Sequence, residues 1–281
     1  MLKLFSQKTR QSSSRDNLPL APLSRCALLG AGVLAAMALI QPAQAEMRAP
    51  AAPVCTLSGS GLDQALTRTR FRLTHGRTLT IVAIGSSSTK GIGASSPDAS
   101  YPSRLQALLQ ARFPDVVIRV LNRGVGGEEE ADMLARFERD VIAEKPDLVL
   151  WQVASNAVMN NRRLSMEETL LRKGIVRLKQ TGADVMLIDP QYTPAVLASS
   201  VVGPIVDLIS AEARRQHIGV FHRFDLMKDW HENQHIPFSA FGVADGVHMN
   251  DWGYDCFARN LAVAIIESAV PPAVASAPAE R

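Results

Sequence analysis

The sequence predicts an α/β fold with three layers, α/β/α, in which helices cover both faces of a five-stranded parallel sheet of flavodoxin-like order. Two observations predict it. Short runs rich in Val and Ile are apolar at consecutive positions, as expected for strands buried on both faces. Segments with helical periodicity separate these runs, and such alternation favours a parallel sheet. The five runs are 79–84, 116–121, 147–153, 184–189 and 218–221.

The segments between the strands are assigned as helices from the spacing of their apolar residues. In 101–113, for example, Leu105, Leu109 and Phe113 lie on one helix face. Similar stripes predict helices over 128–142, 166–180, 204–216 and 252–268. We therefore expect one domain from about 60 to 269. In such sheets ligands bind beyond the carboxyl ends of the strands, so the loops after the five strands are the places to look for chemistry.

Charge is concentrated at the N-terminus. The whole chain has 30 basic and 27 acidic residues, and residues 1–45 hold five of the basic and one of the acidic ones. The remainder, with 25 basic and 26 acidic residues, is close to neutral. The basic isoelectric point therefore comes from the first 45 residues, and the composition gives no electrostatic reason to expect a nucleic-acid partner.

The N-terminal segment resembles a secretory signal. A basic region ends at Arg25, an uncharged apolar run covers 26–40, and "QPAQA" follows with an A-x-A pattern that predicts cleavage after Ala45. The run is shorter than the roughly 20 residues that span a bilayer. We expect an exported protein, periplasmic or secreted, without stable membrane insertion after cleavage; an uncleaved anchor is the alternative. Residues 46–59 are expected to be a linker, and 270–281 a disordered Pro/Ala tail.

Cysteine usage leaves one question open. Cleavage after Ala45 removes Cys26 and leaves Cys55 and Cys256. Two cysteines in an exported chain can form a disulfide, which here would join the N-terminal arm to the last helix. The alternative is two unpaired thiols, one in a mobile arm and one buried.

Three loops after predicted strands carry polar or glycine-rich sequences. The first, "GSSSTKG" over 85–91, brings three serines to the sheet edge, where the N–H groups of a helical turn favour an oxyanion. In the second, "NRGVGGEEE", Gly127 is placed to donate its N–H to an oxyanion, and in the third Asn156 is placed to donate its side-chain amide. Each loop is equally compatible with an ordinary turn or helix cap.

Asp245 and His248 are three residues apart in "ADGVHMN", immediately before the last predicted helix. In a turn, this spacing brings the carboxylate back to the imidazole. The carboxylate then accepts from Nδ1–H and leaves Nε2 available as a base. The spacing also occurs by chance, and a solvated turn is the alternative interpretation.

A second motif points to different chemistry. His231, Glu232 and His235 form an H-E-x-x-H match, which on a helix is typical of a catalytic zinc site. Pro237 follows closely and disfavours a helix that continues past the second histidine. We therefore expect a loop that flanks the cleft and no catalytic metal.

Taken in chain order, these motifs resemble those of the SGNH, or GDSL-like, hydrolase family over residues 78–268. The family's G-D-S-x-T-x-G motif corresponds to 85–91, "GSSSTKG", and this register selects Ser87 among the three serines. Its G-x-N-D motif corresponds to 154–157, "ASNA", and its D-x-x-H motif to Asp245 and His248. The chain departs from the family at Ser86, which replaces Asp, at Ala154, which replaces Gly, and at Ala157, which replaces Asp.

The resemblance implies a serine esterase with a Ser87–His248–Asp245 triad, an acyl-enzyme intermediate and no cofactor or metal. It implies an oxyanion hole formed by the N–H groups of Ser87 and Gly127 and the amide of Asn156. The expected substrate is a small-molecule or glycan ester. The segments that flank the cleft lack a long apolar stripe, which favours short acyl or O-acetyl groups. Two alternatives are a non-catalytic carbohydrate-binding domain of the cell envelope and an O-acyltransferase with the same triad.

Overall fold

A parallel sheet of five strands lies at the centre of the computed structural model, which describes residues 52–57, 62 and 64–270. The strand order is β2-β1-β3-β4-β5, and every neighbouring pair is parallel. This is the flavodoxin-like order that the sequence predicted. The strands are β1 (Thr78–Gly85), β2 (Val117–Gly124), β3 (Leu148–Gln152), β4 (Asp184–Ile188) and β5 (Gly219–Phe221).

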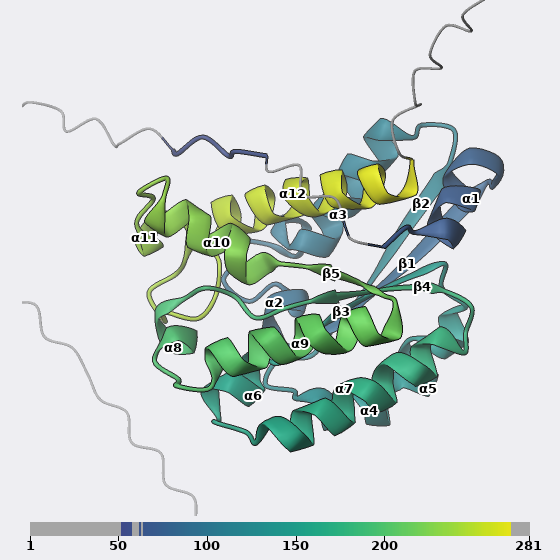
Figure 1. Cartoon of the computed structure of the whole chain (residues 1–281). Helices are drawn as coiled ribbons and strands as arrows, with labels where there is room; N and C mark the ends of the chain where they lie inside the picture. The colour runs from purple at the N-terminus through teal and green to yellow at the C-terminus, as the bar shows by residue number, and fades with distance from the viewer. Residues whose placement is uncertain (1–51, 58–61, 63, 271–281) are drawn as a thin grey trace, which may run out of the picture. The chain divides into compact units, whose positions relative to one another are not determined.

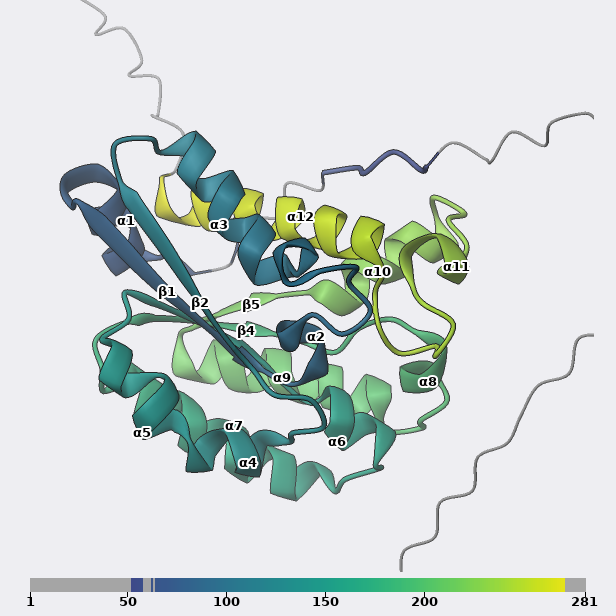
Figure 2. The same ribbon diagram turned by 180° about the vertical axis from the view of Figure 1, so that it is seen from behind.

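Helices cover both faces of the sheet (Figures 1 and 2). One layer contains α1 (Thr67–His75), α3 (Tyr101–Arg112), α10 (Arg223–Glu232) and α12 (Asp251–Ala269). The other contains α4 (Glu130–Ala135), α5 (Phe137–Asp140), α7 (Leu164–Lys179) and α9 (Val202–Gln216). Alternate residues of β1 enter the two cores, with Ile81 in the first and Val82 and Ile84 in the second. The pleat of the strand therefore explains the three layers.

Short helical turns follow the carboxyl ends of the strands. In Figure 2, α2, α6 and α8 lie at one end of the sheet, and α1 lies at the other. Sequence periodicity did not predict these turns, because each is too short to show a helical repeat. The turns after strands are α2 (Ser87–Lys90), α6 (Ser155–Met159) and α8 (Pro194–Leu197). Other short turns, elsewhere in the chain, are α11 (Phe238–Phe241) and two 3₁₀ turns over Pro97–Ala99 and Ile142–Glu144.

Two expectations from the sequence were wrong in detail. The helix predicted over 128–142 is divided into α4, α5 and a 3₁₀ turn, because the backbone leaves the helical conformation at Arg136 (φ −109°, ψ 5°). Strand β2 was expected to be buried on both faces, but it forms an edge of the sheet and only Ile118 within it is fully buried. An edge strand has one neighbour fewer, so its apolar run is covered mainly on one side.

Cys55 and Cys256 form a disulfide, with an S–S distance of 2.07 Å, which answers the question that the sequence left open. The bond joins the N-terminal arm to α12. The indole N–H of Trp252 also donates to the carbonyl of Pro53 (2.8 Å), so the arm is attached at two points near the start of that helix.

Several predicted features lie outside the described residues. These are the signal segment 1–45 with its cleavage point at Ala45, most of the linker 46–59, and the tail beyond Val270. Within the part of the chain that the structure describes, no helix is both long enough and apolar enough to cross a membrane.

Candidate active site

Ser87 is the accessible member of the three serines. Strand β1 ends at Gly85, Ser86 precedes the first turn of α2, and Ser87 is its first residue. Ser86 and Ser88 are 1% and 2% exposed, whereas Ser87 is half-buried. The turn requires glycine at 85, because a Cβ there would lie 2.2 Å from Oγ1 of Thr89. The chain thus presents one hydroxyl at the sheet edge and buries its two neighbours.

His248 and Asp245 form a hydrogen-bonded line with Ser87. His248 Nε2 lies 2.7 Å from Ser87 Oγ, and His248 Nδ1 lies 2.6 Å from Asp245 Oδ2. The other carboxylate oxygen, Asp245 Oδ1, accepts from the backbone N–H groups of Val247 (2.8 Å) and His248 (2.9 Å). These bonds close the turn over the Asp-x-x-His sequence, so the predicted spacing produces the predicted geometry.

The charge of Asp245 is stabilised within that turn. Partial burial raises the pKa of its carboxyl. The hydrogen bonds from the His248 ring and from the two backbone N–H groups outweigh this effect, so the pKa lies below its ordinary value of 3.8. A carboxylate that stays ionised at neutral pH can orient the imidazole and stabilise its protonated form.

The glycine-rich loop after β2 passes beside Ser87. A Cβ at Gly126 would lie 3.9 Å from Ser87 Cβ, whereas one at Gly127 would meet no atom within 4 Å. Gly127 has a φ of +82°, so its backbone adopts a left-handed conformation next to open space. Gly126 was not singled out from the sequence, although it lies nearer to Ser87.

Asn156 lies on α6, which follows β3. Its Nδ2 donates to the carbonyl of Glu128 (2.8 Å), the residue directly after Gly127. A side-chain amide nitrogen carries two hydrogens, so this bond uses one of them. The structure therefore joins the loop that contains Gly127 to the turn that contains Asn156. The glycine-rich loop is also bonded to the loop of Ser87, because the N–H of Val125 donates to the carbonyl of Gly85 (3.0 Å).

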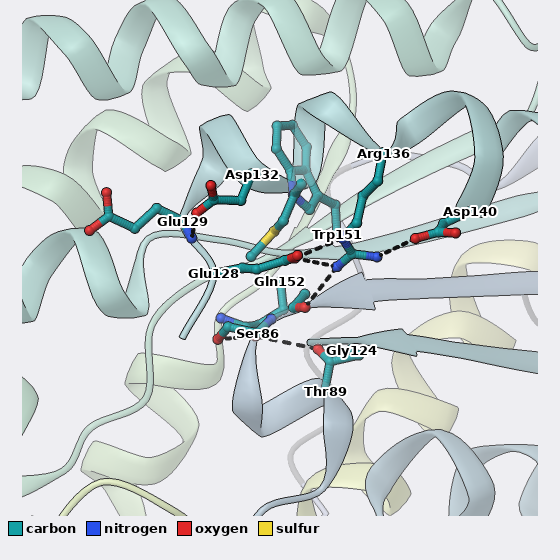
Figure 3. A network of polar contacts seen from close by, with 12 residues as sticks. Ser86, Thr89, Gly124, Glu128, Glu129, Asp132, Arg136, Asp140, Trp151 and Gln152 are labelled. Carbon is teal, nitrogen blue, oxygen red and sulfur yellow. Dashed lines mark hydrogen bonds and ion pairs between the residues drawn. The ribbon is translucent and has the colours of Figure 1, made fainter. Parts of the chain in front are cut away.

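Arg136 forms buried hydrogen bonds that fix the position of the glycine-rich loop. This role of Arg136 was not predicted from the sequence. Its guanidinium, 8% exposed, donates to Glu128 Oε2 (2.7 Å), Asp140 Oδ2 (2.9 Å) and the carbonyl of Gly85 (3.3 Å). Figure 3 shows it between the two carboxylates. The arginine links the end of β1 to the loop after β2.

A chain of buried polar side chains starts at the turn that contains Ser87. Both the N–H and the hydroxyl of Ser86 donate to Gln152 Oε1, at 2.8 and 3.0 Å (Figure 3). Gln152 Nε2 in turn donates to Ser155 Oγ (3.1 Å). Gln152 is a polar residue at the carboxyl end of an otherwise apolar strand, and this signal could have identified it from the sequence.

The same chain continues to the loop of the histidine. Ser155 Oγ donates to Gln191 Oε1 (2.7 Å), and Gln191 Nε2 donates to the carbonyl of Val247 (3.3 Å). The fully buried Arg223 donates to both Ser155 Oγ (3.2 Å) and Gln191 Oε1 (2.9 Å). Burial lowers the pKa of Arg223 to about 10, so it remains charged at neutral pH. The loops after β1, β3 and β4 and the histidine turn are therefore joined beneath the site.

A cavity of about 360 Å³ opens beside His248. Most of its wall is apolar, and it is formed by the segment before the histidine and by the start of α8. This size is within the range of small-molecule sites. The lining residues are Thr193, Pro194, Phe238, Ser239, Phe241, Gly242, Val243, Ala244, Gly246 and His248.

The H-E-x-x-H match does not form a zinc-binding helix. Helix α10 ends at Glu232, and His235 has a left-handed backbone (φ +55°). His231 Nδ1 lies 3.1 Å from the carbonyl of Ile236, and Tyr192 donates its hydroxyl hydrogen to Glu232. The two histidines therefore do not share a helix face. Among the residues that the structure describes, no three His, Cys, Asp or Glu side chains are grouped to hold a metal ion.

The fold and the site together define an α/β protein with a serine, a histidine and an aspartate aligned at the carboxyl edge of its sheet. The chain belongs to the Non-GDSL lipase-like family, whose model matches residues 53–270. The family is named for lacking the GDSL motif, so the resemblance to SGNH, or GDSL-like, hydrolases is not confirmed by it.

Relatives of known structure or activity support the fold. The chain is 33% identical to an acetylxylan esterase of Geobacillus stearothermophilus over 102 residues, which cover 33% of this chain and 47% of that enzyme. The structure is similar to a two-domain esterase active on acetylated mannans (TM-score 0.63, 20% identity, 77% of this chain and 57% of that one). It is also similar to an α/β hydrolase from a lake metagenome (TM-score 0.56, 24% identity, 67% and 96%). The chain thus spans about half the length of the first two relatives.

Proposed function

We propose that this protein is an exported serine esterase that removes short acyl groups, above all acetyl groups, from a glycan. One observation carries the proposal: the hydrogen-bonded line from Asp245 through His248 to Ser87 at the ligand-binding edge of the sheet. This is the arrangement that makes a serine hydroxyl nucleophilic. Relatives that act on acetylated xylan and acetylated mannan support the choice of substrate.

In the proposed reaction, Ser87 Oγ attacks the ester carbonyl while His248 Nε2 takes its proton. The N–H groups of Ser87 and Gly127 and the second hydrogen of the Asn156 amide stabilise the developing oxyanion. His248 then gives its proton to the departing alcohol, and an acyl-enzyme remains. Water, activated by His248, attacks the acyl-enzyme and releases the acid. These roles match those that the resemblance to the SGNH family implied.

The cavity beside His248 is the proposed site of the alcohol. Because His248 must protonate the leaving oxygen, the alcohol departs on the histidine side, and this cavity includes His248. Its apolar lining, with Phe238 and Pro194, suits the C–H face of a sugar ring. We therefore expect the glycan ring to bind in the cavity and the acyl group to lie next to the loops of Gly127 and Asn156.

The experiment that tests the proposal uses a fluorophosphonate and two serine variants. The secreted domain should form an adduct at Ser87, located by peptide mass spectrometry, and should release acetate from acetylated xylan or mannan. Ser87→Ala should abolish both, whereas Ser88→Ala, which changes a buried neighbour, should retain both. Labelling of wild type without acetate release, but with acetyl transfer to a sugar hydroxyl, would identify an acyltransferase. No labelling of the folded domain would contradict the triad and favour a binding domain.

Export is a separate part of the proposal and rests on the pattern of residues 1–45. Expression of the full chain in a bacterium, followed by N-terminal sequencing of the mature protein, should give Glu46 as the first residue. A mature protein that begins at Met1 and sediments with membranes would contradict cleavage and favour the anchor.

A further inference from the structure

The glutamates of the "EEE" run, 128–130, all contact the turn that carries Asn156. The carbonyl of Glu128 accepts from Asn156. The carboxylate of Glu129 accepts from Asn160 Nδ2 (2.6 Å) and Arg162 Nε (2.9 Å), which lie at the far end of α6. The carboxylate of Glu130 accepts from the backbone N–H of Ala154, which precedes α6. The three glutamates therefore form hydrogen bonds with the residue before α6, with a residue inside it and with residues that follow it.

The backbone of Ala154 adopts a conformation that requires a stabilising interaction. It is buried and has a left-handed backbone, with φ 65° and ψ −1°. A residue with a Cβ is strained in this conformation, which glycine adopts freely. Glycine is the residue that the motif of the resembled family has at this position, so the chain places a strained residue where a relaxed one is usual. The bond from Ala154 N–H to Glu130 stabilises the strained conformation directly before the oxyanion turn.

Glu130 is itself paired with a second buried acid. Glu130 and Glu167, on α4 and α7, are 0% and 1% exposed, and their carboxyl groups lie close enough for a hydrogen bond to form between them if one is protonated. Glu130 Oε2 and Glu167 Oε2 are buried and meet no N–H or O–H donor from the described residues. Two carboxylates are acceptors only, so a bond between them requires one proton. The pair is stable as one carboxylate and one carboxylic acid, and not as two adjacent charges.

We propose that Glu130 and Glu167 are positioning residues, and that the proton they share keeps the Ala154–Asn156 turn in place for oxyanion binding. The inference rests on the proposed esterase function. With the proton present, Glu167 donates to Glu130, and Glu130 keeps its other oxygen on Ala154 N–H. When the proton leaves, two negative charges face each other in the core, the carboxyl groups separate, and the turn with Asn156 moves with Glu130.

The electrostatic surroundings fix the pH at which this happens. Burial, the charge of Glu130 and the hydrogen bond between the two acids raise the pKa of Glu167 to about 8. Glu129, at the start of α4, raises it further, whereas Arg162, after α6, lowers it. Arg162 is itself bonded to Glu129 and faces Asp132 as well. The arginine thus compensates only in part for the acidic groups around the pair.

The decisive variant is Glu167→Gln. Its amide donates to Glu130 at every pH, so it imitates the protonated acid and cannot lose the proton. Wild-type kcat on an acetyl ester should fall about tenfold between pH 7 and 10, with a midpoint near pH 8, since weakening one oxyanion donor costs at most roughly 10²–10³. KM should change less than twofold. In Glu167→Gln, kcat should stay flat over this range and equal the wild-type value at pH 7.

Glu168→Gln is the matched control. It removes the same charge one residue along α7, where Glu168 pairs with Arg172 and Arg215 and not with Glu130. It should keep the wild-type alkaline fall. A similar fall in Glu167→Gln, or no fall in wild type, would overturn the inference.

A thermal measurement tests the shared proton without using activity. The pKa of Glu167 is raised on folding, so the folded state retains a proton that the unfolded chain releases above its ordinary value of 4.5. This contribution to stability is therefore lost as the pH rises from about 4.5 to 8. The difference in Tm between Glu167→Gln and Glu168→Gln should increase in favour of Glu167→Gln as the pH rises over this interval, and it should level off above pH 8. A constant difference would overturn the inference, even if Ser87 proved not to be a nucleophile.

Discussion

His248 Nε2 lies 2.7 Å from Ser87 Oγ, although 161 positions separate the two residues in the sequence. The parallel sheet makes this contact possible, because it brings the carboxyl end of β1 and the turn before α12 to the same edge. In the proposed reaction, this distance places the histidine within hydrogen-bond reach of the serine proton that it would take.

Asp245→Asn should lower kcat by about 10³–10⁴-fold, because an amide no longer stabilises the protonated His248 or its tautomer. The pKa of Asp245 is below its ordinary value in the fold, so its stabilising contribution is present above that value and is lost as the pH falls through the folded pKa. The variant should therefore have a lower Tm than wild type at pH 7, and the difference should shrink as the pH falls below 3.8 and through the folded pKa. Wild-type turnover at pH 7 in this variant would contradict the orienting role.

Phe238→Ala should raise KM for acetylated xylo-oligosaccharides about fivefold, because roughly 1 kcal/mol of contact with a sugar ring is lost. Phe238 lines the cavity beside His248 and stacks on His231 with ring centroids 3.9 Å apart. KM for methyl acetate, whose alcohol is too small to reach the ring, should not change. Phe71→Ala, which removes an exposed phenyl ring from α1 at the other end of the sheet, is the control. Equal effects on both substrates would exclude Phe238 from alcohol recognition.

Ala154→Gly should leave stability within about 0.5 kcal/mol of wild type, since relief of left-handed strain offsets the lost methyl group and the added flexibility of the unfolded chain. Ala157→Gly, at a buried position with ordinary helical geometry on the same α6, should cost about 1 kcal/mol or more. Urea unfolding of both variants measures the difference. If Ala154→Gly is the more costly of the two, its backbone is not strained as we describe.

Reduction of the Cys55–Cys256 disulfide should lower the free energy of unfolding by about 2–4 kcal/mol, because the bond closes a loop of 201 residues and restricts the unfolded chain. For a domain of this size the Tm should fall by roughly 4–15 °C. Calorimetry with and without a phosphine reductant measures it, and Cys55→Ser/Cys256→Ser should behave like the reduced protein. An unchanged Tm would show that the arm contributes nothing to stability.

Much of the fold followed from local patterns in the sequence. Buried strands such as β3 are apolar at every position, and the strand order follows from alternation with helices. Edge strand β2 was assigned correctly in position but not in burial, since its residues do not reveal how many neighbours a strand has. The helix over 128–142 was broken by Arg136, whose partners Glu128 and Gly85 lie in other elements.

The site was predictable where its chemistry is local. The turn over Asp245 and His248 needs only a three-residue spacing, and it forms as expected. Gln191 and Arg223 were missed because their roles arise from contacts over 32 or more positions, which no spacing rule encodes. The Glu130–Glu167 pair was missed because charged residues on helices normally face solvent.

The position of the disulfide also determines when it can form. Cys55 lies before the first strand, whereas Cys256 lies in the last helix, 201 residues later. Cys256 is not available to Cys55 until α12 has been synthesised, after all five strands. The bond can therefore join the N-terminal arm to the domain only once the last helix is present.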